Sequence, residues 1–277
     1  MKNNAFPIFL AAWLILLAAR GFTPAPAPVQ TAETAEAVYT LEALSEEETF
    51  LSEGGRKLAD YSYQLLVLSV ANLEELSPEE AEAAQRNVET FHAKMSALME
   101  ELTAYGAVMG DDAAQMERDG YTIEAYYDRA AASGTMAGDL VSVRVDQCSY
   151  TGGAHPNRYT SSYLFDLRIG QFIDPTQLAD DPAAFQCGAA ELLREKADAI
   201  TRNRDGYWPD YGEIISRWSE GAVLFDEEGM LVVYSTYELG PYVMGEVELR
   251  LSYEELAGLI GDGGLARLGM APAAAEE

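Results

Sequence analysis

A loop of glycine, histidine, proline and asparagine holds the residue types best suited to chemistry in this chain. It reads Tyr-Thr-Gly-Gly-Ala-His-Pro-Asn and ends at Asn157. Gly152 and Gly153 permit a positive φ, or a close approach of the backbone to a ligand. Pro156 fixes its own φ and restricts His155 to an extended conformation. The loop is therefore predicted to be rigid and to present one imidazole and one amide as a recognition site.

Two other interpretations of this loop stay open at the level of sequence. In a structural turn, His155 would only hydrogen-bond the backbone and the glycines would only satisfy turn geometry. In a catalytic site, the imidazole would need a carboxylate partner, and Asp146, Asp166 and Glu238 are equal candidates. The chain contains no nucleophile elbow, zinc-protease motif or phosphate loop. We assign no catalytic residue; whether the protein is an enzyme is left open, with a non-enzyme favoured.

Two aromatic segments offer further candidate surfaces. Tyr237, Glu238 and Tyr242 could hold a sugar or a basic side chain, because tyrosine combines stacking area with a polar tip. They could also form a rigid corner between two strands. Residues 207–211 form an aromatic loop, in which an exposed Trp208 would be unfavourable unless it packs or binds. The predicted ligand-binding residues are Gly152, Gly153, His155, Asn157, Tyr237, Glu238 and Tyr242.

The charge of the chain limits its partners. Its 277 residues carry a formal net charge of −28 at pH 7, and 48% of them are hydrophobic, as in an ordinary globular protein. Such a charge disfavours nucleic acid and anionic membranes and favours basic protein partners. The alternative is that the acidic residues only solvate helix faces.

Cysteine and histidine are scarce. Cys148 and Cys187 are the two cysteines. The sequence does not show whether their Cα atoms come close enough to form a disulfide bond. His92 and His155 are the two histidines. These numbers exclude a zinc site built from cysteine alone and a histidine-rich metal site. We predict neither a metal nor a cofactor.

The amino terminus has the pattern of an export signal. Lys2 precedes an apolar run over residues 6–19, which is too short for a comfortable membrane span. Arg20 stands where a bacterial lipoprotein would carry its lipidated cysteine. We expect a signal segment over residues 1–22 and an extended linker over 23–37. The protein is then secreted, or tethered to the membrane by an uncleaved leader, at the bacterial cell envelope.

The first part of the folded region predicts two strands and one long helix. The strands cover residues 38–51 and 58–70. Ser77 begins a capping box with proline at the first helical position. An apolar stripe carries this helix to about Tyr105, with Gly106 as its stop.

The remaining region alternates short strands with two further helices. Alternating apolar residues and turn signals predict the strands and hairpins, and a proline start and a capping box predict the helices. The expected strands cover residues 121–128, 141–145, 159–167, 223–225, 230–234 and 247–251, and the expected helices start at Pro182 and after Ser252. The fold class is α+β, with antiparallel sheets each packed by a long helix, in two lobes that meet near residue 138.

Several of these segments together resemble a known bacterial domain. It is the extracytoplasmic domain of unknown function shared by the anti-sigma factor RsiV and the amino-terminal region of the peptidoglycan deacetylase PdaC. The resemblance covers residues 139–261, after a variable amino-terminal α+β lobe over 38–138 and before a tail over 262–277. It rests on the Gly-Gly-Ala-His-Pro-Asn loop, Phe165-Asp166-Leu167 with Gly170, the helix from Pro182, residues 237–242 with Gly245, and Ser252-Tyr253 before a short helix.

The resemblance implies a binding or sensing module outside the membrane. In RsiV this module binds lysozyme, and in PdaC it accompanies a catalytic domain without being the deacetylase. We expect this chain to depart from both, with no separate catalytic domain after residue 260 and no sigma-binding segment before the apolar run. The expected function is non-catalytic binding of a cell-envelope ligand, either a basic wall hydrolase such as lysozyme or a peptidoglycan fragment. The alternatives are a wall-polymer hydrolase using His155 with a carboxylate, and a structural envelope module.

Overall fold

The computed structural model describes residues 31–34, 37–201 and 206–270. The predicted signal segment over residues 1–22 lies outside the described residues. Within the described ranges, no helix has both the length and the apolar character needed to cross a membrane.

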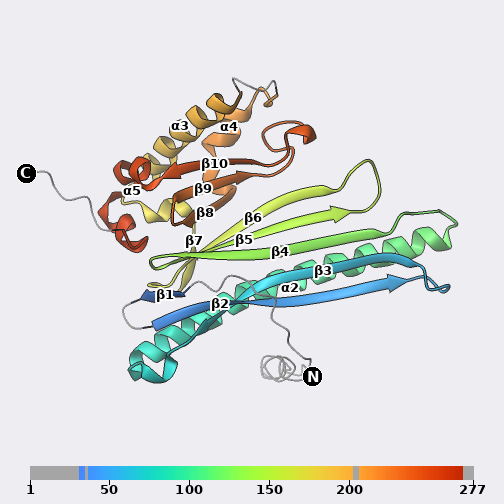
Figure 1. The fold of residues 1–277 in the computed structure, drawn as a ribbon, viewed down its shortest axis with the longest axis horizontal. Coiled ribbons are helices and arrows are strands. Elements are labelled where there is room, and N and C mark those ends of the chain that lie inside the picture. The colour runs from blue at the N-terminus through green and yellow to red at the C-terminus, as the bar shows by residue number, and fades with distance from the viewer. Residues whose placement is uncertain (1–30, 35–36, 202–205, 271–277) are drawn as a thin grey trace, which may run out of the picture.

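A seven-stranded sheet forms the first lobe, and its strands follow one another in chain order (Figure 1). All neighbouring strands pair antiparallel except β3 and β4, which are parallel. The parallel pair departs from the predicted antiparallel sheet, because the long helix between these two strands acts as a crossover connection. The strands are β1 (Thr31–Thr34), β2 (Ala37–Leu51), β3 (Lys57–Val70), β4 (Tyr126–Ala137), β5 (Leu140–Tyr150), β6 (Asn157–Asp166) and β7 (Gln171–Ile173).

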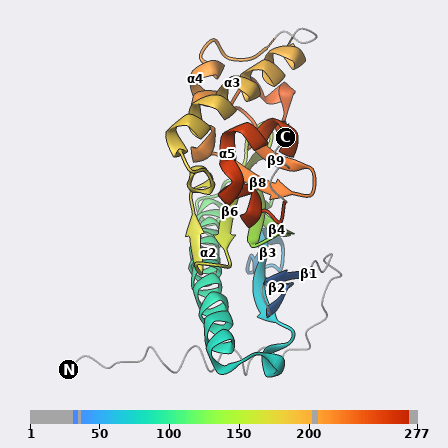
Figure 2. The ribbon, with the colours of Figure 1, turned by 90° about the vertical axis from the view of Figure 1, so that its left-hand side faces the viewer.

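Helix α2 (Pro78–Arg118) runs along one face of this sheet (Figures 1 and 2). The predicted capping box at Ser77 is present. The predicted stop at Gly106 is wrong, because the helix continues through this residue. A Cβ at Gly106 would collide with the Tyr61 ring, so glycine here lets the helix approach β3 closely.

The second lobe holds a three-stranded antiparallel sheet in the order β10–β9–β8. It stands over one end of the first lobe (Figures 1 and 2). Helix α3 packs on the small sheet as α2 packs on the large one. The strands are β8 (Ala222–Asp226), β9 (Gly229–Tyr234) and β10 (Val247–Ser252), and the helices are α3 (Pro182–Thr201), α4 (Tyr211–Ser216) and α5 (Tyr253–Arg267). Single turns of 3-10 helix are η1 (Leu73–Glu75), η2 (Pro175–Leu178), η3 (Trp218–Glu220) and η4 (Tyr242–Met244).

The predicted α+β class is confirmed, with differences at several element ends. Residues 121–125 precede β4 instead of belonging to a strand. The capping box at Ser252 is present, but α5 continues past Ile260 through a kink at Gly261. Leu268 is buried, so the start of the predicted tail belongs to the core.

The predicted boundary between the two domains falls in a tight turn. Gly138 and Asp139 join β4 to β5, which pair along their whole length. The backbone N–H of Asp139 donates to the carbonyl of Arg267, 2.7 Å away, at the end of α5. Both lobes therefore meet at this turn, and the division of the chain into two domains there stays a prediction.

Side-chain hydroxyl groups attach β8 to the open face of the large sheet. The backbone N–H of Phe225 donates to Ser142 Oγ at 2.9 Å, and that of Val223 donates to Ser162 Oγ at 2.6 Å. Thr135 Oγ1 donates to the carbonyl of Phe225 at 2.9 Å. These bonds give partners to backbone N–H and C=O groups of β8, the edge strand of the small sheet. Without them, these groups would be buried and unpaired.

Replacing Ser142 with alanine should destabilise the protein. Ser142 is 1% exposed, so the Ser142→Ala variant leaves the N–H of Phe225 buried without its acceptor. An unsatisfied buried donor costs about 1 to 3 kcal/mol. Urea unfolding measures this loss, and Ser133→Ala, at an exposed serine of β4, is the control. Equal stability of the two variants would contradict the role given to Ser142.

Candidate functional site

The Gly-Gly-Ala-His-Pro-Asn loop joins β5 to β6 at the edge of the second lobe. Gly152 and Gly153 have φ values of 94° and 112°, which a residue with a side chain rarely adopts. Asn157 is the first residue of β6 and pairs with Ser149 of β5. The glycines thus provide the backbone turn that was predicted, and the loop projects His155 back toward the second lobe.

His155 packs against two tyrosines that lie far away in the sequence. Its ring stacks on the Tyr242 ring with 3.7 Å between centroids and an 18° interplanar angle. Its Nε2 lies 3.0 Å from the hydroxyl of Tyr237, within hydrogen-bond distance. Its Nδ1 lies 3.2 Å from the carbonyl of Pro156. The two segments that the sequence offered as separate candidates therefore form one site.

Trp208 joins the third candidate segment to this site. Its indole Nε1 donates to the carbonyl of Tyr237 at 3.0 Å, and its backbone N–H donates to the carbonyl of Leu239 at 2.8 Å. Tyr237 has a φ of 76°, and among the described residues it is the one with a side chain and a positive φ. These contacts hold Tyr237 in a backbone conformation that is disfavoured for a tyrosine.

The resulting surface exposes large apolar groups beside the imidazole. Val243 of η4 is 89% exposed, Tyr237 is 47% exposed and Trp208 is 38% exposed. Val243 was not among the ligand-binding residues predicted from the sequence, because no residue pattern around it indicates that its side chain is exposed. We use the name aromatic surface for His155, Trp208, Tyr237, Tyr242 and Val243. An exposed apolar group of this kind is typical of a protein interaction site.

Glu238 turns away from the imidazole. Its carboxylate accepts a hydrogen bond from the backbone N–H of Ser235. Desolvation against the surrounding loop raises the pKa of Glu238, while its hydrogen bonds to Ser235 lower it, and the net direction is upward. Glu238 therefore helps to shape the turn before η4 and does not pair with His155.

The other two carboxylates considered as partners of His155 are engaged elsewhere. Asp146 pairs with Arg144, with 2.9 Å between Oδ1 and Nε. Asp166 is fully buried, and its Oδ2 lies 3.4 Å from the Arg267 guanidinium. Within the described ranges, the hydrogen-bond partners of the His155 ring are the phenol of Tyr237 and the carbonyl of Pro156, and neither is a carboxylate. The geometry thus supplies a binding surface more readily than an acid–base pair.

A groove lies beside the aromatic surface, between the second lobe and the open face of the large sheet. Its volume is about 730 Å³, and Tyr242 contributes to its wall. Cys148 also lines it, half-buried, whereas Cys187 is exposed on α3; both thiols are free. In the described part of the chain, no group of three or more His, Cys, Asp or Glu residues is arranged to hold a metal ion.

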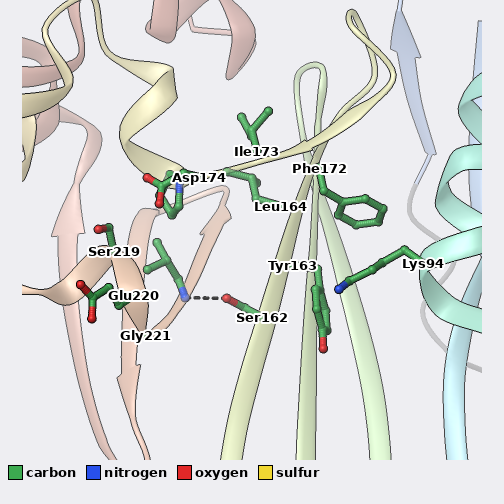
Figure 3. Close-up of a pocket in the computed structure, with 12 residues that line it drawn as sticks. Lys94, Ser162, Tyr163, Leu164, Phe172, Ile173, Asp174, Ser219, Glu220 and Gly221 are labelled. Carbon is green, nitrogen blue, oxygen red and sulfur yellow. Dashed lines mark hydrogen bonds between the residues drawn. The ribbon is translucent and has the colours of Figure 1, made fainter. Parts of the chain in front are cut away.

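A smaller cavity of about 280 Å³ lies between β6, β7, η3 and α2 (Figure 3). In it, Lys94 lies over the ring of Tyr163, 4.8 Å from the centroid. Glu220 and Asp174 lie on the opposite side of the cavity from Lys94 (Figure 3). None of the predicted ligand-binding residues lines this cavity, and the Ser162 bond to β8 forms part of its wall.

Comparison with known proteins finds a family match within the second lobe. Residues 212–254 match the family model described as protein of unknown function (DUF3298). This is the domain shared by RsiV and PdaC, so the resemblance stated from the sequence is confirmed. No curated protein matches the chain.

Two crystal structures of DUF3298 proteins share the fold of this chain. A DUF3298 member from Bacteroides fragilis has 18% identity and a TM-score of 0.59, with 83% of this chain and 96% of that chain covered. A DUF3298 protein from Pseudomonas aeruginosa has 18% identity and a TM-score of 0.52, with 81% and 95% covered. The similarity extends beyond residues 212–254 to both lobes.

Replacing Glu238 with glutamine should stabilise the protein in a pH-dependent way. Because folding raises the pKa of Glu238, the ionised form is disfavoured in the folded state, and this cost grows as the pH rises above the normal range of a glutamate. The Glu238→Gln variant keeps an acceptor for Ser235 and removes the charge. We expect a higher urea midpoint than wild type at pH 7, with a gain that disappears as the pH falls below about 4.

Exposed Glu227, in the turn between β8 and β9, provides the control substitution Glu227→Gln. A gain for Glu238→Gln that is the same at every pH would show that desolvation of the carboxylate is not its cause.

Proposed function

We propose that this chain is a non-catalytic binding module at the bacterial cell envelope, where it docks a basic wall hydrolase such as lysozyme on the aromatic surface. The match of residues 212–254 to the DUF3298 family model supports this proposal. The observation that carries the proposal is the exposure of Val243, Tyr237 and Trp208 in one place, around an imidazole fixed by two tyrosines. Tryptophan and tyrosine are the residues that most often dominate protein interfaces.

The charge around the aromatic surface supports a basic partner. The exposed carboxylates Asp210, Glu238 and Glu246 lie within three residues of Trp208, Tyr237 and Val243 in the sequence. The net charge of −28 adds a long-range attraction for a cationic protein. An apolar centre with an acidic rim matches the usual anatomy of an interface.

A location outside the cytoplasm agrees with this partner. The leader pattern over residues 1–22 and the Pro-rich segment after it favour export. Secretion and tethering by an uncleaved leader both leave the aromatic surface available to enzymes that act on the wall.

The hydrolase alternative depends on an acid–base pair at His155. The side-chain partner of this imidazole is the phenol of Tyr237, which orients the ring but is a poorer acid–base partner than a carboxylate. The binding role is therefore preferred, and the alternative of a purely structural envelope module is distinguished from it by the experiment below.

Placing a cation in the middle of the aromatic surface should weaken lysozyme binding. The Val243→Lys variant replaces an apolar contact with an ammonium group that repels a basic partner. Because Val243 is exposed, the substitution should leave the fold intact. We expect the dissociation constant to rise by roughly tenfold or more. Calorimetric titration at low ionic strength measures the change.

The matched control is Val108→Lys, because Val108 is 59% exposed on the surface of α2. Raising the salt concentration should weaken wild-type binding, since screening reduces the attraction between opposite charges. Absence of lysozyme binding to the wild type at low salt would refute this partner, and equal losses in the two variants would refute the site.

A further inference from the structure

Two arginines and a cysteine form one row across the open face of the large sheet. In the strand register, Ser62 of β3 pairs with Arg129 of β4, which pairs with Cys148 of β5, which pairs with Arg158 of β6. Residues paired in this way point to the same side of a sheet. Their sequence neighbours Asp128 and Tyr63 are buried on the opposite side, toward α2. The row therefore faces away from α2, on the floor of the 730 Å³ groove.

Polar groups surround this row. The next row along the strands holds Gln64, Asp146 and Thr160 on the same face. The second lobe closes the groove from above with Tyr242 and Glu246. The lining thus combines guanidinium, carboxylate, hydroxyl and amide groups with the aromatic residues Tyr159 and Tyr242, and such convergent polar groups are typical of a site for a small polar ligand.

Two of the three arginines in the groove are already neutralised. Arg144 is within 2.9 Å of a carboxylate oxygen in each of Asp146, Glu246 and Glu248. Arg129 forms an ion pair with Asp60. These guanidinium groups serve mainly to hold the groove together.

Arg158 differs from both. Its side chain is exposed, and within the described ranges its guanidinium makes no ion pair and no hydrogen bond. It lies on the same side as Arg129, two strands away, at about 10 Å between backbones. Desolvation raises the pKa of Tyr127, and both guanidinium groups partly oppose this rise. In a chain with a net charge of −28, an unpaired arginine that points into a groove is an unusual feature.

We propose that this groove binds a small ligand through a carboxylate, and that Arg158 is the residue that holds this carboxylate. Arginine binds carboxylates with two parallel hydrogen bonds, which gives direction as well as attraction. Arg129, which is paired with Asp60, lies on the same side of the sheet. Ser62, Gln64 and the Tyr242 ring contact the remainder of the ligand. Acidic sugars and short peptides share this chemistry, and both fit a groove of about 730 Å³.

This site is separate from the docking of a basic protein, although Tyr242 belongs to both. The aromatic surface attracts a cation, whereas Arg158 attracts an anion. Salt should weaken protein docking strongly. It should affect the groove less, because salt also screens the repulsion between the acidic chain and an anionic ligand.

Titration of the full chain with matched pairs of ligands tests the proposal. N-acetylmuramic acid and N-acetylglucosamine share a sugar and an amide but differ in the carboxylate. Alanyl-alanine and its carboxyl-terminal amide differ in the same way. We expect nuclear magnetic resonance titration to show millimolar or tighter binding of at least one acid, and binding of its neutral counterpart at least roughly tenfold weaker. The acid that binds identifies a saccharide or a peptide as the source of the carboxylate.

The Arg158→Gln variant should weaken the binding of that acid by roughly tenfold or more, since glutamine keeps a polar group without the charge. Arg158→Lys should recover part of the affinity. The control is Arg217→Gln, which changes an exposed arginine after α4, outside the groove. Binding of neither acid, equal binding of acid and neutral ligand, or an unchanged Arg158→Gln variant would overturn the proposal.

The Val243→Lys variant separates the two proposals. It should lose the basic protein and keep the carboxylate ligand. A chain that binds an acid but not lysozyme contradicts only the docking proposal, and the reverse result contradicts only the groove.

Discussion

The arrangement of the two lobes depends on hydroxyl groups of the large sheet that bond to the backbone of β8. A sheet edge presents unpaired N–H and C=O groups, and burying such an edge against another sheet is unfavourable unless each group finds a partner. Ser142, Ser162 and Thr135 provide these partners on three neighbouring strands. The two sheets can then pack without becoming one continuous ladder, and the second lobe has a single position on the first.

That position determines where the candidate site forms. The same kind of contact occurs at the far end of β9, where Ser235 Oγ accepts from the backbone N–H of Thr160 of β6 at 2.8 Å. Thr160 Oγ1 also lies 2.7 Å from carboxylate oxygens of Glu246 and Asp146. The connection from β9 to β10 is thereby held over β6, as Figure 1 shows, and Tyr242 reaches His155. The aromatic surface and the groove are two sides of this one connection.

Local signals in the sequence were sufficient for most elements. The capping boxes at Ser77 and Ser252 predicted both helix starts, because their hydrogen bonds involve only neighbouring residues. The end of α2 was not predictable, since Gly106 has the residue type of a helix stop. Its actual role, a close contact with Tyr61, depends on a strand that lies far away in the sequence.

The site was predictable in its parts and not in its assembly. The glycines, His155 and the two tyrosines were identified by residue type. Their meeting depends on a contact across 82 positions, which no local pattern encodes. The groove was missed for the same reason, because Arg129 and Arg158 become neighbours only through the pairing of β4, β5 and β6.

The left-handed backbone of Tyr237 has a consequence for the cost of association. A flexible loop that presents a tyrosine loses conformational entropy when a partner immobilises it, and this loss reduces affinity. In this protein, the hydrogen bonds from Trp208 and the contact with His155 already fix Tyr237 in the folded state. The entropy loss, and a backbone strain of order 1 to 3 kcal/mol, therefore belong to folding and not to binding. An arriving molecule therefore finds the phenol already preorganised, and the free energy of contact is not consumed in arranging it.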